Sequence, residues 1–418
     1  MQRYIVTLLI VLLFWSGCSL KSPKINNSAK IDGPLIQTAF LESNGYFAPA
    51  ASMYEKLYKM TGSRLFLIKT IENYYRAKQF DKALQYARKG LKLYPKEPRF
   101  YELAAVLYIQ KKDLIQAEKY VKEAIKLKKS PQNYELLASI YLTQKRYELA
   151  LKYYKSAYAL KPSATTLSTM AYIMYFYLGK KREAIAYLET HMRIYGCSKQ
   201  VCHSLASFYS LQNNIDGMIS VYKRLYETYK NPQYAKKVIE FLVYQNRIDE
   251  AIVWAKKTEM KKVLLDLYRM KKEYKKAYRL ANKLFQETKN HKYLADAAIF
   301  EYESANEKNI KLLEDVAQKM EKALKYVKDP VYYNFLGYLY IDHDLNIKRG
   351  IELVQKALES DPNSPYFLDS LAWGYYKIGK CKDALEIMKK VYYDFGLKEP
   401  EVEYHLKTIQ KCVKGKRP

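Results

Sequence analysis

Small residues recur along this chain at a nearly constant interval, and this period constrains the fold more than any other feature. The members of the series follow one another by about 33 or 34 positions: Ala50, Ala83, Ala117, Ala150, Ala184, Gly217 and Ala251. A fixed period of this length indicates a repeat protein, in which each unit buries its apolar face against its neighbours. With only 14 Gly and 13 Pro in 418 residues, a helical repeat is favoured over a loop-rich β architecture.

The period slips once and then resumes. Gly350 and Ala384 are again one period apart, and Gly350 lies three full periods after Ala251. Between them Ala277 follows Ala251 by clearly less than one period. We therefore expect an irregularity over residues 260–310, with a short first helix in the eighth repeat and an insertion near residues 304–309.

Residues inside each period resemble the tetratricopeptide repeat. In one period Tyr134, Ala138 and Tyr141 lie one turn apart, and Ala150 and Tyr154 continue the pattern on a second helix. The resemblance implies an all-α, right-handed α-solenoid of about 11 helical hairpins over residues 31–418. A C-terminal capping helix would span residues 401–414, and the most family-like repeats would be residues 330–396.

The first residues predict export. Arg3 precedes a twelve-residue apolar stretch from Tyr4 to Trp15, which is too short to span a bilayer, and Ser16-Gly17-Cys18 closes it. This arrangement resembles the lipobox of bacterial lipoproteins. It implies that residues 1–17 are a signal peptide, that Cys18 carries acyl chains and that residues 18–30 form a flexible tether. The alternative is an uncleaved signal anchor, and the implied location is the periplasmic face of the outer membrane.

The first helix of each repeat lines the inner wall of such a solenoid. We predict a partner-binding groove from the inward positions of these helices, since aromatic side chains are good anchors for peptides. The alternative is that superhelical winding buries several of these side chains. The predicted groove residues are Tyr75, Ile109, Leu142, Phe176, Tyr209, Tyr338, Trp373 and Tyr376.

Basic residues dominate the first two-thirds of the chain. Residues 18–290 hold 50 Lys and Arg against 23 Asp and Glu, whereas residues 291–400 hold 16 against 18. For an exported lipoprotein the expected anionic partners are lipid, lipopolysaccharide or peptidoglycan, and not nucleic acid. A genome rich in A and T, whose codons favour Lys and Tyr, explains the same composition without a function.

Four cysteines remain besides Cys18, and an even number in an exported chain suggests disulfides. Cys197 and Cys202 are close in sequence, across the turn between the fifth and sixth hairpins. Cys381 opens the second helix of the eleventh hairpin, and Cys412 ends the closing helix beside it. We predict these two pairs, with four unpaired core thiols as the alternative.

No catalytic motif is recognisable in the sequence. It contains no metalloprotease, nucleophile-elbow, phosphate-loop or dinucleotide signature, so we expect a chain that is not an enzyme and needs no cofactor. Asp342-His343-Asp344 is the densest group of metal-ligand types. We expect a solvated turn there and no metal site.

The C-terminal repeats resemble those of proteobacterial envelope tetratricopeptide proteins. The resemblance rests on Tyr333-Asn334, Gly337-Tyr338 and the segment from Leu368 to Tyr376. It implies a non-enzymatic, lipid-anchored periplasmic scaffold that binds protein or peptide clients through its concave surface. The alternatives are a component of an outer-membrane assembly or polysaccharide-export machine, and an activating cofactor of a periplasmic protease or peptidoglycan hydrolase.

Overall fold

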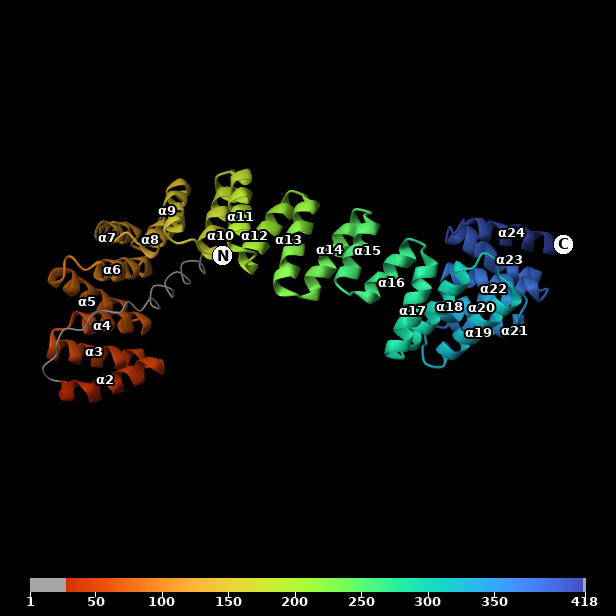
Figure 1. The fold of residues 1–418 in the computed structure, drawn as a ribbon, viewed down its shortest axis with the longest axis horizontal. Coiled ribbons are helices and arrows are strands. Elements are labelled where there is room, and N and C mark those ends of the chain that lie inside the picture. The colour runs from red at the N-terminus through yellow and green to blue at the C-terminus, as the bar shows by residue number, and fades with distance from the viewer. Residues whose placement is uncertain (1–27, 416–418) are drawn as a thin grey trace. The chain divides into compact units, whose positions relative to one another are not determined.

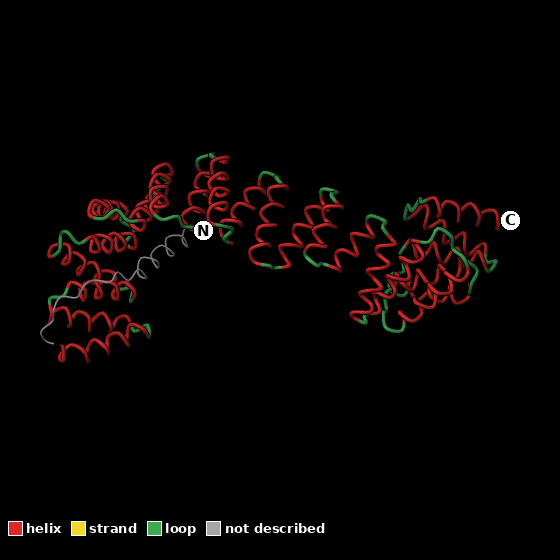
Figure 2. Tube along the Cα trace, in the orientation of Figure 1, coloured by secondary structure: helices red, strands yellow, loops and turns green. Residues whose placement is uncertain are grey.

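The computed structural model describes residues 28–415. Helices joined by short turns make up this part of the chain, and it contains no β-strand (Figures 1 and 2). The helices form eleven consecutive antiparallel hairpins, α2–α3 to α22–α23, and α24 follows them. The expected all-α solenoid of about 11 hairpins with a closing helix is therefore confirmed. Cys18, the signal peptide and most of the tether lie outside the described residues.

The chain divides into two compact units, residues 1–234 and 235–418. The first unit contains the first six hairpins and the start of α14. Its helices are α2 (Ser28–Ser43), α3 (Phe47–Thr61), α4 (Arg64–Arg76), α5 (Phe80–Leu93), α6 (Pro98–Gln110), α7 (Leu114–Leu127), α8 (Pro131–Thr143), α9 (Tyr147–Leu160), α10 (Ala164–Tyr172), the π-helical turn η1 (Ile173–Tyr177), α11 (Lys181–Tyr195), α12 (Lys199–Leu211) and α13 (Ile215–Tyr229).

The second unit contains the remaining hairpins and the closing helix. Its helices are α14 (Pro232–Tyr244), α15 (Ile248–Lys257), α16 (Lys261–Met270), α17 (Tyr274–Thr288), α18 (His291–Ser304), α19 (Ile310–Leu324), α20 (Pro330–Asp342), α21 (Ile347–Leu358), α22 (Pro365–Lys377), α23 (Cys381–Lys389), the π-helical turn η2 (Lys390–Asp394) and α24 (Pro400–Val413). Helix α16 has only ten residues, and residues 305–309 connect α18 to α19.

The periodic small residues hold the two helices of each hairpin close together. Ala83, Ala117, Ala150 and Ala184 are all fully buried, each near the start of the second helix of its hairpin. At Gly350 the approach is closer still, because an added Cβ would lie 2.7 Å from the carbonyl oxygen of Gly337. Only small side chains allow this helix–helix distance, which explains the period in the sequence.

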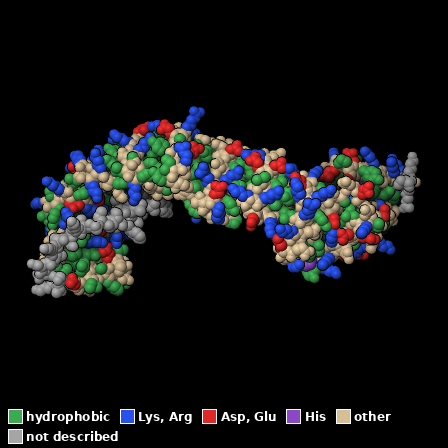
Figure 3. Space-filling view, viewed as in Figure 1, with side chains coloured by type: hydrophobic (Ala, Val, Ile, Leu, Met, Phe, Trp, Pro, Cys, Tyr) green, Lys and Arg blue, Asp and Glu red, His purple; other side chains and the backbone are tan. Residues whose placement is uncertain are grey.

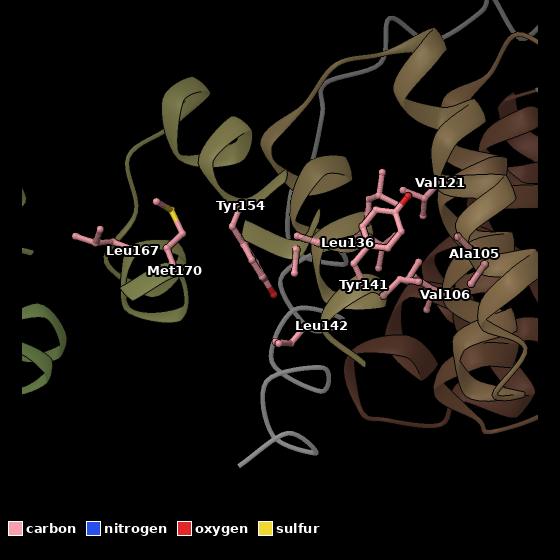
Figure 4. Close-up of a cluster of buried hydrophobic side chains, with 14 of the residues drawn as sticks. Ala105, Val106, Val121, Leu136, Tyr141, Leu142, Tyr154, Leu167 and Met170 are labelled. Atoms are coloured by element: carbon pink, nitrogen blue, oxygen red, sulfur yellow. The ribbon is translucent and has the colours of Figure 1, made fainter. Parts of the chain in front are cut away.

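Apolar side chains between successive hairpins form a continuous core through the first unit. Figure 4 shows part of it, which includes Leu136 and Tyr154 of the fourth hairpin and Leu167 and Met170 of the fifth. All four side chains are almost fully buried. Each hairpin thus depends on its neighbours for burial of its apolar surface.

Candidate partner-binding surface

The eight predicted groove residues do not share one environment. Only Phe176 is exposed, with 49% of its surface accessible to solvent. Tyr75, Ile109, Tyr338 and Tyr376 are half-buried. Leu142, Tyr209 and Trp373 are buried, so the prediction that they line an open groove needs correction at these three positions.

Tyr209 is buried because its register is one residue away from the predicted one. It belongs to a series of buried tyrosines at the seam between hairpins, which recur with the same period as the small residues: Tyr74, Tyr108, Tyr141, Tyr175 and Tyr209. The Tyr209 hydroxyl donates to Glu189 on the preceding hairpin, as the Tyr141 hydroxyl donates to Glu118. The inward position in this hairpin is therefore Ser210, which is exposed.

Leu142 is buried within the core of the first unit, although its register is the predicted one. It follows Tyr141 directly, as Phe176 follows Tyr175, and Figure 4 places it at the edge of the apolar cluster. Neighbouring apolar side chains therefore cover this position, and burial by tight winding is the better interpretation for Leu142.

Trp373 is buried because the closing helix packs over it. Its ring stacks on the His405 ring of α24 at 4.1 Å between centroids, and on the Tyr376 ring at 4.7 Å. The indole Nε1 donates to Asp342 Oδ1 at 3.0 Å. Only 4% of the Trp373 surface remains accessible. We call Tyr338, Trp373, Tyr376 and His405 the Trp373 cluster.

Hydrogen bonds from α24 complete the Trp373 cluster. His405 Nδ1 lies 3.0 Å from Asp369 Oδ1, and both residues are buried. The Tyr338 hydroxyl donates to Glu401, although the two residues are 63 positions apart. Burial, together with this bond to the Glu401 carboxylate, raises the pKa of Tyr338. Asp342, Asp369 and Glu401 thus bind the polar groups of this cluster, so it is a stabilising core at the end of the second unit.

The exposed Phe176 lies on an unusual backbone turn. The Leu178 amide donates to the Ile173 carbonyl at 3.1 Å, five residues earlier, which closes a single π-helical turn at the end of α10. Such a turn inserts one residue into a helix and is often found at functional sites. Here it places Phe176 and Tyr177 side by side, both partly exposed.

Rings from three hairpins meet around η1. Tyr147 of α9 stacks parallel to Tyr177, with 4.1 Å between centroids. Tyr172 lies 4.7 Å from Phe176, and Phe208 of α12 stacks on Tyr175 at 4.2 Å. We call this group the η1 cluster, and its members are Tyr147, Tyr172, Tyr175, Phe176, Tyr177 and Phe208.

The η1 cluster has a buried base and an open outer edge. Tyr175 and Phe208 are buried, whereas Phe176 and Tyr177 are 49% and 38% exposed. The Lys181 ammonium lies 5.5 Å from the Tyr175 centroid, and burial raises the pKa of Tyr172. Rings held in place by neighbours lose little entropy on binding, so this edge is suited to an apolar or aromatic partner side chain.

The four predicted disulfide cysteines lie in two close pairs. Cys197 is bonded to Cys202 and Cys381 to Cys412, with Cα–Cα distances of 5.7 and 5.8 Å. The second bond joins α24 to the start of α23. It therefore fixes the helix that covers the Trp373 cluster.

Metal-ligand residues are dispersed in the described part of the chain. No three His, Cys, Asp or Glu side chains there come together in a way that could hold a metal ion. In the predicted solvated turn, His343 Nε2 lies 2.9 Å from the Tyr302 hydroxyl, and Asp344 pairs with Lys377 at 2.8 Å. These side chains thus connect neighbouring hairpins.

Charged side chains are spread over the surface. Figure 3 shows Lys and Arg interspersed with acidic and apolar side chains on the face in view. Many lysines in the described part of the chain pair locally, for example Lys122 with Glu118 and Lys126 with Glu123. Within residues 28–415, no helix has the length and apolar character needed to cross a bilayer.

Comparison with known proteins agrees with this hairpin geometry. A tetratricopeptide repeat model matches residues 69–134 and 116–165, which include α6 to α9. The chain contains tetratricopeptide repeats. A TPR repeat-containing protein of Pseudomonas aeruginosa, PA4667, is 34% identical over 97 residues, which are 22% of this chain and 16% of that protein. The match thus spans about a sixth of the curated relative.

Two solved structures are similar at low identity. Pseudomonas aeruginosa PilF is 18% identical, with 49% of this chain and 90% of that chain covered and a TM-score of 0.34. YrrB, described as a TPR protein with an unusual peptide-binding site, is 14% identical, with 44% and 96% covered and a TM-score of 0.35. Tetratricopeptide repeats are typical of protein-interaction scaffolds, and the repeats of this chain indicate that general role.

Sequence reasoning named Phe176 but missed the cluster around it. The π-helical turn leaves no recognisable pattern, because one inserted residue is absorbed within the usual repeat length. The run Tyr175-Phe176-Tyr177 was the available signal, since two of its rings cannot face the seam together. The tyrosine series would likewise have placed Tyr209 correctly.

Proposed function

We propose that this chain is a lipid-anchored periplasmic scaffold that holds a protein or peptide partner at the η1 cluster. The observation that carries the proposal is the exposed edge of Phe176 and Tyr177 on a base of packed rings. Exposed aromatics supported in this way are typical binding hot spots, which often contribute about 2 kcal/mol or more.

Anchoring rests on the sequence from Met1 to Cys18. The apolar stretch from Tyr4 to Trp15 supports export, and Cys18 after Ser16-Gly17 supports acylation. Acyl chains on Cys18 would hold the repeats at the membrane surface and raise the local concentration of any bound partner. The test is the mass of the N-terminal peptide from the native host. A peptide that begins at Cys18 with acyl groups is expected, and an unmodified Cys18 contradicts the anchor.

The partner site is tested by site-specific crosslinking in the full chain. A photo-reactive phenylalanine replaces Phe176 in one variant and Ile194 in a control, because Ile194 is an exposed apolar residue on α11 outside the cluster. We expect a defined crosslinked partner at position 176 only. The same adducts at both positions, or none at 176, would contradict the site.

Affinity gives the quantitative test with the partner so identified. Phe176→Ala is expected to weaken binding about 30-fold, which corresponds to about 2 kcal/mol. Ile194→Ala is the matched control and should leave affinity unchanged. The identity of the partner also separates a general scaffold from an assembly component or a hydrolase activator.

A further inference from the structure

The first helix, α2, has an uncovered apolar face. Ile36 and Phe40 are 71% and 62% exposed, and they lie one turn apart on the side of α2 opposite Ile31 and Thr38, which are buried. Among the charged side chains of α2 that the structure describes, only Asp32 is exposed, since Glu42 is half-buried. Glu42 is paired with Lys69 at 3.1 Å.

The repeat register shows what these positions do elsewhere. Two, three and four periods after Ile36 come Leu103, Leu136 and Met170, and Phe40 corresponds to Leu107, Ile140 and Met174. All six of these later residues are buried in the core of the first unit. The outer face of α2 therefore has the composition of an interface between hairpins, but no described hairpin precedes it.

The closing helix α24 exposes a mostly charged face. Its exposed side chains include Glu401, Lys407 and Lys411 beside Tyr404 and Val413, and Lys407 pairs with Glu403 at 3.7 Å. Terminal repeats of solenoids normally need such a polar face for solubility. The apolar face of α2 departs from this rule, which points to an occupant.

We propose that the outer face of α2, at Ile36 and Phe40, contacts the lipid bilayer. This inference rests on the anchoring part of the proposed function. Nine residues, 19–27, separate Cys18 from the start of α2, and they reach at most about 30 Å when fully extended. An anchor at Cys18 would thus keep this face next to the membrane surface.

The charges beside the apolar face match an anionic membrane. Lys21, Lys24 and Lys30 outnumber the one acidic residue, Asp32, in the sequence between Cys18 and Ile36, and Lys56 and Lys59 of α3 are exposed, with Lys59 paired to Glu55. Basic residues near an anionic bilayer add electrostatic attraction to the membrane surface. A second copy of the chain is a poorer occupant, because a symmetric contact would bring the same lysines together.

Depth-dependent quenching tests the contact in the full, acylated chain. The protein is reconstituted into phosphatidylethanolamine–phosphatidylglycerol vesicles whose acyl chains carry bromine, with Phe40→Trp as reporter and Ile194→Trp as control. Trp254 and Trp373 give the same background in both variants. We expect blue-shifted emission and loss of most of the added signal for Phe40→Trp, and little loss for Ile194→Trp.

Each other outcome overturns the inference. Equal quenching of the Phe40→Trp and Ile194→Trp reporters excludes contact between the outer face of α2 and the bilayer. This holds whether a second copy of the chain or the residues before α2 cover that face. A dimer in sedimentation that Ile36→Glu with Phe40→Glu dissociates identifies the second copy. The mass of the N-terminal peptide is measured in the same sample. A chain without acyl groups therefore contradicts the anchor, whereas an acylated chain without quenching contradicts only this contact.

Discussion

The Trp373 cluster and the η1 cluster each contain an aromatic residue at the inward position of a first helix, Tyr376 and Phe176, yet their environments differ. In the Trp373 cluster, His405 and Glu401 of α24 cover the rings and bind Asp369 and the Tyr338 hydroxyl. At the η1 cluster, packed rings support Phe176 from below but leave half of its surface open. The same repeat position therefore serves the core in one unit and presents a surface in the other.

An inward aromatic residue thus takes its role from the polar partners around it. The indole and phenol groups of the Trp373 cluster need hydrogen-bond partners when they are buried, and Asp342 and Glu401 supply them. Phe176 carries no polar group that needs a partner, and half of its surface stays in contact with solvent. Four sets of substitutions test this difference between the two clusters.

Trp373→Ala is expected to have the largest effect on stability. Removal of a buried ring that stacks on His405 and Tyr376 should lower the free energy of unfolding of the second unit by about 3–5 kcal/mol. Urea unfolding followed by Trp254 fluorescence measures it, since Trp254 lies in the same unit. A loss below about 1 kcal/mol would show that the cluster is not a core.

Removal of the disulfide between α23 and α24 should cause the second-largest loss of stability. Cys381→Ser with Cys412→Ser opens a loop with a sequence separation of 31 residues. In the chain-entropy model this destabilises the second unit by about 3–4 kcal/mol. The control is Cys197→Ser with Cys202→Ser, which spans only 5 residues and should cost about 2 kcal/mol in the first unit. Hydrogen exchange resolves the two units, and equal losses would contradict this order.

Tyr338→Phe should lower the stability of the second unit by an intermediate amount. It removes the hydroxyl that donates to Glu401 but keeps the ring, so the expected loss of stability is about 1–2 kcal/mol. Tyr393→Phe, at an exposed tyrosine of η2, is the control and should change nothing measurable. If Tyr338→Phe and Tyr393→Phe unfold at the same urea concentration, the hydrogen bond from Tyr338 to Glu401 of α24 does not stabilise the Trp373 cluster.

Phe176→Ala should have the smallest effect on stability, about 1 kcal/mol or less, because half of its ring already contacts solvent. Thermal unfolding and hydrogen exchange over α10–α12 measure it. Phe208→Ala is the contrasting variant, because this ring is buried against Tyr175 and its loss should cost about 3–5 kcal/mol. A large loss of stability in Phe176→Ala would show that the η1 cluster is part of the core.

The contact between the two helices of each hairpin was predictable, because it depends on residues close in sequence. Ala117, Ala150 and Ala184 recur where two helices touch, and their spacing gives the hairpin count without tertiary information. The groove was less predictable. One residue of register moved Tyr209 from the inward face to the seam, where its hydroxyl reaches Glu189.

Helix periodicity and the small residues between the two helices of each hairpin are local properties that repeat with each unit, so the sequence alone predicts the hairpins and their number. Which aromatic residues stay exposed follows only from the tertiary structure. That choice depends on contacts between residues as distant as Tyr338 and Glu401, and on one π-helical turn that exposes Phe176. Burial is the sum of all neighbours in space, and no short window of sequence contains them.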